Sequence, residues 1–262
     1  MEEKASPEWC DGLLQFWLTE LGRDVLCEEQ EMLQCLLARC FGLHGVQLGL
    51  TAETPLIYQA ALPHVVVVDI SCRSFSGKKN LVQLQSDPSQ LALAANSVDM
   101  VLIHHGLDVA AQPKAWLREA TRILRPGGSL VIVGFNPWSF WGVIRWLCFP
   151  WHKAVWLQNP LSVGRLSDWL GVLDFVLVEQ RRGCFQMPGR HRLLRWVEPL
   201  LMWVMRKYFP GSGAVYGLLA RKKTHAMTPW LRFSAQAANL LPGWSLEHPV
   251  MSAPVTKPHT KS

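Results

Sequence analysis

The chain has 262 residues and a mass of 29.6 kDa, with 49% hydrophobic and 18% charged residues and a mean hydropathy of +0.10. This balance excludes an intrinsically disordered chain, and the length suits one large α/β domain. The formal charge of 26 − 20 = +6 is unevenly distributed, because residues 1–40 carry nine acids against three bases whereas residues 181–223 carry ten bases against one acid. The basic second half indicates either an anionic partner or a solvated basic face.

The seven cysteines include no C-x-x-C pair, so the sequence predicts neither a zinc site nor a disulfide framework, and no metal is expected. The N-terminus lacks the basic and apolar regions of a signal peptide, and the sequence contains no run of 18 or more apolar residues. We therefore expect a cytoplasmic protein with reduced thiols.

Hydrophobic periodicity predicts helices that alternate with strands. A helix is expected over 24–40, with leucines on one face and acids on the other, followed by a strand over 45–50. Val65–Val68 is a continuous β-branched run, typical of a strand buried on both faces of a parallel sheet. Further strands are expected at 81–85, 98–103, 129–135, 175–178 and 214–220, and helices over 113–124 and after Ser162. The alternation predicts a doubly wound α/β sheet.

The predicted organisation has three parts. Residues 1–41 form an N-terminal helical segment, residues 42–223 an α/β domain, and residues 224–262 a polar tail that is expected to be poorly ordered. Two segments inserted into the domain, 136–160 and 184–212, are expected to carry specificity.

Chemistry-bearing residues follow several of the predicted strands. In an open α/β sheet, ligands bind outside the carboxyl ends of the strands, and these ends fall near Gly49, Asp69, Asp87 and His104. Gly49 permits close approach of the backbone, and carboxylates suit ribose hydroxyls or the polar edge of a base. A tight turn, a solvated acid and a helix N-cap are the structural alternatives. Two acids at successive strand ends indicate a site more strongly than either acid alone.

One long stretch carries a family pattern. It runs from Ser86-Asp-Pro-Ser-Gln-Leu91 through Asn96-Ser-Val-Asp-Met-Val-Leu-Ile-His-His105 to Leu124-Arg-Pro-Gly-Gly-Ser-Leu-Val131. This pattern resembles the class I S-adenosylmethionine-dependent methyltransferases, in particular the type 11-like group. Phe135-Asn-Pro-Trp-Ser-Phe-Trp-Gly142 is similar to a little-characterised bacterial branch of that family. The resemblance implies a Rossmann-like seven-stranded sheet with helices on both faces, an antiparallel last strand, and S-adenosylmethionine bound across the first four strand ends.

Carried over to matching positions, the resemblance implies specific cofactor contacts. Gly49 would approach the methionine part and Asp69 the ribose. Asp87 would hold the adenine amino group, with Pro88 beside the ring. His104 follows the fourth strand, where the family lines the space between cofactor and acceptor.

The end of the first strand departs from the family pattern. The glycine-rich turn D-x-G-C-G-x-G reads Gln47-Leu-Gly-Leu-Thr-Ala-Glu53 here, so Gln47 replaces the acid and keeps only the ability to accept a hydrogen bond. Two functions stay open: methyl transfer from S-adenosylmethionine to a small or hydrophobic acceptor, or a non-catalytic methyltransferase-like binding protein. For the first, His105 is the candidate general base, with a hydrogen-bonded structural histidine as the alternative.

The segment 189–210 combines an apolar stripe with flanking arginines and Lys207. A basic amphipathic helix suits an anionic membrane surface or a cap over an apolar acceptor, and packing against its own domain is the alternative. A nucleic-acid partner is not expected, because no base-reading motif accompanies the basic residues. The sequence gives little support for a nicotinamide dehydrogenase, because no G-x-G-x-x-G motif opens the first helix.

Overall fold

A computed structural model of the chain describes residues 15–49, 56–60, 62–69, 81–84, 86–139, 161–184, 203, 207 and 212–224. Residues 1–224 form one compact unit and residues 225–262 a second. The second unit lies outside the described residues, as does the predicted tail beyond Thr224. The inserted segments are described only at their edges and at positions 203 and 207.

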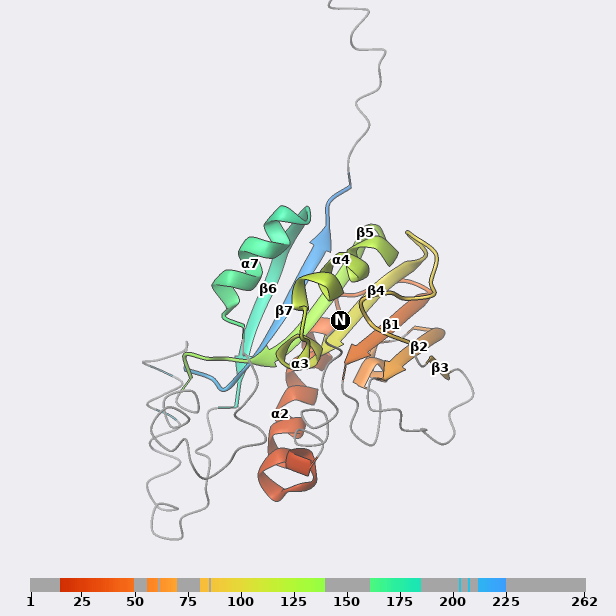
Figure 1. Ribbon diagram of the computed structural model, residues 1–262. Helices are drawn as coiled ribbons and strands as arrows, with labels where there is room; N and C mark the ends of the chain where they lie inside the picture. The colour runs from red at the N-terminus through yellow and green to blue at the C-terminus, as the bar shows by residue number, and fades with distance from the viewer. Residues whose placement is uncertain are drawn as a thin grey trace, which may run out of the picture. The chain divides into compact units, whose positions relative to one another are not determined.

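The first unit is built on a seven-stranded sheet (Figure 1). Its strands are β1 (His44–Gly49), β2 (His64–Asp69), β3 (Leu81–Leu84), β4 (Val98–His104), β5 (Leu124–Phe135), β6 (Phe175–Gly183) and β7 (Val215–Lys222). Their order is β3-β2-β1-β4-β5-β7-β6. β1 to β5 pair in parallel, and β7 runs antiparallel to both β5 and β6. The doubly wound sheet and its antiparallel last strand are therefore confirmed.

Apolar side chains pack on both faces of this sheet. On one face, α2 (Glu20–Leu37) and the 3-10 helix η1 (Leu56–Gln59) cover a cluster that includes Val65 and Val67. On the other face, α4 (Pro113–Ile123) and α7 (Val163–Val172) cover a cluster that includes Val68. Successive residues of a strand point to opposite faces, so the β-branched run of β2 is buried from both sides as predicted.

Helix α2 starts earlier than its apolar periodicity predicts. Thr19 caps it, because its side chain accepts a hydrogen bond from the backbone N–H of Gly22 at 3.1 Å, and the helix begins at Glu20. It ends at Leu37, three residues before the predicted end. The expectation that its acids all face solvent is wrong at one position, since Glu29 is only 1% exposed.

Strand β5 begins at Leu124, five residues before its predicted start. The preceding helix ends at Ile123, before Pro126-Gly127-Gly128, and the chain pairs with β4 on both sides of this tripeptide, with a register shift between Val98 and Met100. Gly127 has φ +78°, which favours glycine. The tripeptide is therefore an irregularity within strand β5 rather than a loop.

Asp99 ties the start of β4 to the chain that enters β1. Its Oδ2 accepts hydrogen bonds from the backbone N–H groups of Leu43 and His44 at 2.5 and 2.9 Å, and its Oδ1 pairs with Arg125 at 2.6 Å. Burial alone would raise the pKa of Asp99, but the two backbone hydrogen bonds and the Arg125 charge lower it. Asp99 is thus a structural carboxylate at the amino end of the strand. No helix among the described residues is long and apolar enough to cross a membrane.

Candidate active site at the carboxyl edge of the sheet

The topological switch point of this sheet lies between β1 and β4. Gly49 at the end of β1 is in register with Asp69 at the end of β2 and with His104 at the end of β4. The backbone therefore brings three of the predicted site residues to one level of one edge, where doubly wound folds bind their ligands. The side chain of Asp69 lies outside the described part of the chain.

Gly49 is required by the protein's own packing. Its φ is +116°, and a Cβ at this position would meet the carbonyl oxygen of His104 at 2.3 Å and the backbone nitrogen of Gly106 at 3.1 Å. Any larger residue would separate the end of β1 from the end of β4. The predicted contact of Gly49 with the cofactor stays a prediction, because this close backbone packing already explains the glycine.

Gln47 is fully buried within β1. Its Oε1 accepts a hydrogen bond at 3.0 Å from the backbone N–H of Ile57, near the start of η1. The amide therefore holds the start of η1, and residues 50–55 between β1 and η1 lie outside the described part of the chain. The sequence predicts a hydrogen-bond acceptor at position 47. Gln47 does accept a hydrogen bond, but its donor is a backbone N–H group of the protein rather than a cofactor.

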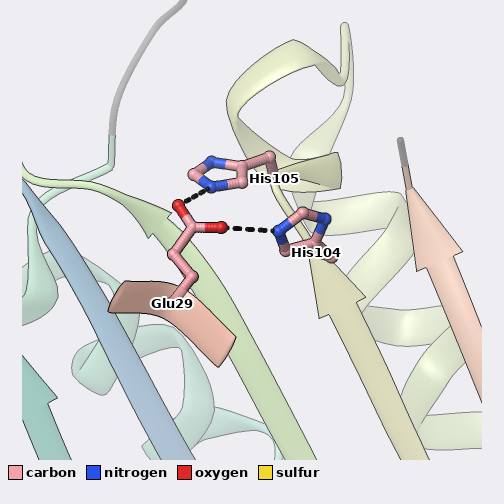
Figure 2. A group of neighbouring side chains, drawn as sticks. All are labelled: Glu29, His104 and His105. Atoms are coloured by element: carbon pink, nitrogen blue, oxygen red, sulfur yellow. Dashed lines mark hydrogen bonds and ion pairs between the residues drawn. The ribbon is translucent and has the colours of Figure 1, made fainter. Parts of the chain in front are cut away.

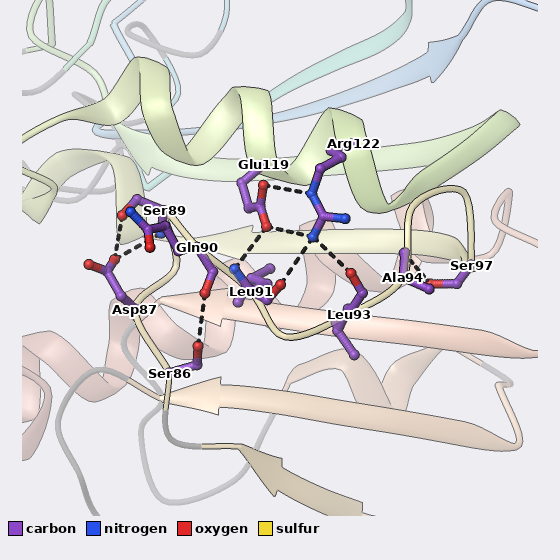
Figure 3. Close-up of polar contacts among 10 residues, drawn as sticks. All are labelled: Ser86, Asp87, Ser89, Gln90, Leu91, Leu93, Ala94, Ser97, Glu119 and Arg122. Carbon is purple, nitrogen blue, oxygen red and sulfur yellow. Dashed lines mark hydrogen bonds and ion pairs between the residues drawn. The ribbon is translucent and has the colours of Figure 1, made fainter.

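Asp87 lies in the loop after β3 and is exposed, whereas Pro88 is buried. Oδ1 of Asp87 accepts hydrogen bonds from the backbone N–H and the hydroxyl of Ser89, at 2.9 and 2.7 Å (Figure 3). This is the local turn geometry that aspartate favours, close to the capping alternative raised above. The other carboxylate oxygen has no hydrogen bond within the described part of the chain.

Helix α4 fixes the path of the same loop (Figure 3). Glu119 accepts a hydrogen bond from the backbone N–H of Leu91 at 2.8 Å, and Arg122 donates to the carbonyl oxygens of Leu91 and Leu93 at 3.0 and 2.8 Å. Glu119 and Arg122 also pair with each other at 2.7 Å, and the hydrogen bonds from Arg122 are the main cause of the lowered pKa of Glu119. The loop that carries Asp87 is therefore held by charged side chains from a different element.

A buried polar cluster fills the carboxyl end of β4 (Figure 2). The carboxylate of Glu29, on α2, contacts Nε2 of His104 through Oε2 and Nε2 of His105 through Oε1, each at 2.9 Å. The three side chains are at most 1% exposed. His105 has φ +49°, in the left-handed region, and this turn directs two successive imidazoles toward one carboxylate.

Asp108 orients His105 from the other side. Its Oδ2 lies 2.9 Å from Nδ1 of His105 and accepts the backbone N–H of Phe135 at 3.0 Å. Asp108 belongs to α3 (Gly106–Val109), a single turn that directly follows β4. The indole of Trp17 stacks on the His104 ring, with 5.2 Å between centroids. The cluster thus joins the N-terminal helical segment to the ends of β4 and β5.

Both ring nitrogens of His105 face carboxylates, which only accept when ionised, so both nitrogens donate and the ring is an imidazolium. Burial alone would lower the pKa of His105, but the charge of Glu29 and the hydrogen bonds to Asp108 and Glu29 raise it to about 9. Burial would raise the pKa of Glu29, but the His105 charge and the two imidazole hydrogen bonds lower it to about 2. In this arrangement His105 has no lone pair with which to take a proton, and its role as a general base stays a prediction.

Known proteins share both the sequence pattern and the fold. The methyltransferase domain family model matches residues 46–132. A SAM-dependent methyltransferase of Thermotoga maritima, described as a possible histamine N-methyltransferase, superposes with a TM-score of 0.58 at 19% identity, over 80% of this chain and 93% of that one. Residues 46–132 therefore match a methyltransferase domain, and the chain has the fold of S-adenosylmethionine-dependent methyltransferases.

Two further proteins are similar to this chain. The putative methyltransferase in a complex with the Haloferax volcanii Trm112 activator superposes with a TM-score of 0.57 at 17% identity, over 81% of this chain and 98% of that chain. The uncharacterised protein YafS of Escherichia coli K12 is 29% identical over 190 residues, which are 72% of each chain. The matched family region begins in β1 and ends in β5, so it contains every predicted cofactor residue but not Glu29.

Sequence reasoning missed Glu29, Asp108 and Trp17. A signal for Glu29 was present, because Val25, Glu29 and Leu33 recur at four-residue spacing and lie on one face of a helix. A carboxylate in an apolar stripe indicates a buried partner. The partners at 104 and 105 lie 75 and 76 residues further along the chain, and no local pattern connects them to Glu29.

Proposed function

We propose that this methyltransferase binds S-adenosylmethionine across the carboxyl ends of β1 to β4 and transfers its methyl group to a small or hydrophobic acceptor. The observation that supports this most directly is the register at the switch point, where Gly49, Asp69 and His104 stand at one level. The family match covers the same strands.

The acids at this edge fit the cofactor chemically. Asp69 and Asp87 supply acceptors for ribose hydroxyls and for an adenine amino group, and one oxygen of Asp87 has no partner in the described part of the chain. When bound, S-adenosylmethionine supplies a methyl group that is already activated on a sulfonium. The protein is then required to hold an acceptor in line and to exclude water.

The buried cluster of Glu29, His105 and Asp108 limits the ways in which the protein promotes methyl transfer. Because His105 is an imidazolium held by Glu29 and Asp108, the proposed reaction relies on positioning rather than on base catalysis by this residue. An acceptor atom that is nucleophilic without losing a proton first fits this arrangement.

Calorimetric titration with S-adenosylmethionine and S-adenosylhomocysteine tests the cofactor site. Asp69→Ala and Asp87→Ala are expected to weaken binding of both ligands at least tenfold. Asp168→Ala, which removes an exposed acid from α7, is the matched control and is expected to bind like the wild type. Unchanged affinity in both Asp69→Ala and Asp87→Ala would refute the site.

One observation favours the alternative of a non-catalytic binding protein. Gln47 stands where the family has an acid, and its amide is already engaged with Ile57. A neutral side chain provides no charge to balance an ammonium group. Absence of binding at millimolar S-adenosylmethionine and S-adenosylhomocysteine, with the fold intact by circular dichroism, would favour this alternative over methyl transfer.

We also propose peripheral contact of segment 189–210 with an anionic membrane surface. Trp203 is 55% exposed, and Nζ of Lys207 lies 4.7 Å from the centre of its ring. An exposed tryptophan beside a basic side chain suits the interface between lipid headgroups and acyl chains. Co-sedimentation with vesicles containing anionic lipid should fall in Trp203→Ala, whereas Trp138→Ala, at another exposed tryptophan, should behave like the wild type. Equal sedimentation with neutral and anionic vesicles would contradict the proposal.

A further inference from the structure

We propose that Glu29, His104 and His105 form a binding site for a divalent first-row transition metal, with zinc as the preferred ion. One carboxylate oxygen and one ring nitrogen from each histidine lie within 4.8 Å of one another, and all three residues are buried. They come from α2 and from the end of β4 (Figure 2). The inference is independent of methyl transfer and departs from the sequence-based expectation of no metal.

The donor set decides the class of ion. Two imidazole nitrogens with one carboxylate suit zinc and its neighbours in the first transition row. Magnesium and calcium prefer sites made of oxygen ligands, which this cluster does not offer. Three protein ligands leave a fourth position of a tetrahedral zinc for water or another small ligand.

The distances are close to those of a coordinated ion. Bonds of about 2.1 Å in a tetrahedral site separate the ligand atoms by roughly 3.4 Å. Oε2 of Glu29 lies 2.9 Å from Nε2 of His104 and Oε1 lies 2.9 Å from Nε2 of His105, and one ligand atom from each of the three residues lies within 4.8 Å of the other two. An ion bound between these atoms replaces the protons that the two Nε2 atoms donate to Glu29.

The surroundings supply the outer support that metal-bound imidazoles have. Nδ1 of His105 donates to Asp108, and a carboxylate in this position fixes ring orientation and leaves Nε2 for the ion. Asp108 is itself held by the backbone N–H of Phe135 at 3.0 Å. The stacked indole of Trp17 limits rotation of the His104 ring.

The formal charges of the cluster also favour a bound divalent cation. Glu29 and Asp108 bring two negative charges into a region that is almost fully buried, and Oδ1 of Asp108 has no hydrogen-bond partner in the described part of the molecule. One imidazolium balances one of these charges. A divalent ion between neutral imidazoles balances both, which removes a cost of burying charge.

The first test is metal binding by the full chain after removal of metal with a chelator. Cobalt(II) and zinc(II) should each bind once per chain, and cobalt should give the visible absorption bands of a four-coordinate site. Glu29→Gln and His104→Gln should lower zinc affinity at least a hundredfold. Asp108→Asn keeps all three ligands and should lower the affinity tenfold to a hundredfold.

His44 and His64 provide the matched control. Their rings stack with centroids 5.2 Å apart at the amino ends of β1 and β2, where they would bind metal adventitiously. His44→Ala/His64→Ala should leave the zinc affinity and the cobalt spectrum unchanged. Absence of stoichiometric zinc binding to the wild type at micromolar concentration would overturn the proposal. So would binding that is lost in the His44/His64 variant and retained in folded Glu29→Gln and His104→Gln.

Discussion

Replacing Glu29 by glutamine removes one charge from the buried cluster and keeps the size of the side chain. The wild-type carboxylate accepts a hydrogen bond at 2.9 Å from each of two imidazoles, whereas the amide retains one acceptor oxygen. His105 would then keep its charge with Asp108 alone, in a region that is almost free of solvent. We expect metal-free Glu29→Gln protein to fold with clearly reduced stability.

The magnitude follows from the pKa of His105. A rise from 6.5 to about 9 corresponds to about 3 kcal/mol of interaction between the charged ring and its partners. Removal of one partner from a buried pair costs about 3–5 kcal/mol in other proteins, which agrees. For a compact unit of residues 1–224, about 3 kcal/mol lowers the Tm by roughly 6–12 °C.

The pH dependence has a defined sign. The pKa of His105 is raised on folding, so its contribution is present in full below about pH 6.5 and is lost as the pH rises to about 9. The pKa of Glu29 is lowered from 4.5 to about 2, so its contribution is present above about pH 4.5 and is lost as the pH falls to about 2. The two shifts describe one interaction, and the stability difference between wild type and Glu29→Gln should be largest between pH 4.5 and 6.5.

Urea denaturation at pH 6 in the presence of EDTA measures this difference. Glu31→Gln removes the same charge from an exposed position of α2, and its free energy of unfolding should match that of the wild type to within about 0.5 kcal/mol. A loss below 1 kcal/mol for Glu29→Gln, or a loss that is equal at pH 6 and pH 9.5, would refute the reasoning.

Three further predictions concern the framework of the edge. Asp99→Ala removes the acceptor of two backbone N–H groups and should reduce the free energy of unfolding by about 2–3 kcal/mol in chemical denaturation, whereas an unchanged midpoint would contradict its structural role. Gly49→Ala places a Cβ 2.3 Å from the His104 carbonyl oxygen and should lower the Tm by at least 5 °C in calorimetry; a Tm within 1 °C of the wild type would show that the strand ends are not closely packed. Arg122→Ala frees the loop that carries Asp87 and should weaken S-adenosylhomocysteine binding severalfold in titrations, with little change in far-ultraviolet circular dichroism, and unaltered affinity would count against that support.

Much of the fold is predictable because its determinants are local. The β-branched run of β2 and the apolar stripes of the helices are visible in the sequence, because apolar residues recur at the spacing that places them on the buried face of a strand or helix. The N-cap at Ser162 is confirmed, since its hydroxyl accepts a hydrogen bond from the N–H of Arg165 at 3.4 Å. The start of β5 was missed because Pro126-Gly127-Gly128 breaks a helix in either context, and only pairing with β4 shows that the sheet continues through it.

The candidate site is less predictable because its contacts join distant segments. The sequence places acids and histidines at strand ends, but it does not show that Glu29 reaches His104 and His105 from α2. Nor does it show that the backbone of His104 fills the space beside Gly49. Buried carboxylates with partners far away in sequence escape an analysis based on periodicity, because each residue alone resembles an ordinary polar position.

The central claim is that this protein binds S-adenosylmethionine at the carboxyl edge of the sheet. Calorimetric titration of the wild type and of Asp69→Ala with S-adenosylhomocysteine tests it most directly. We predict micromolar binding of one ligand per chain by the wild type, lost or at least tenfold weaker in Asp69→Ala. Absence of binding by the folded wild type at millimolar ligand would contradict the account.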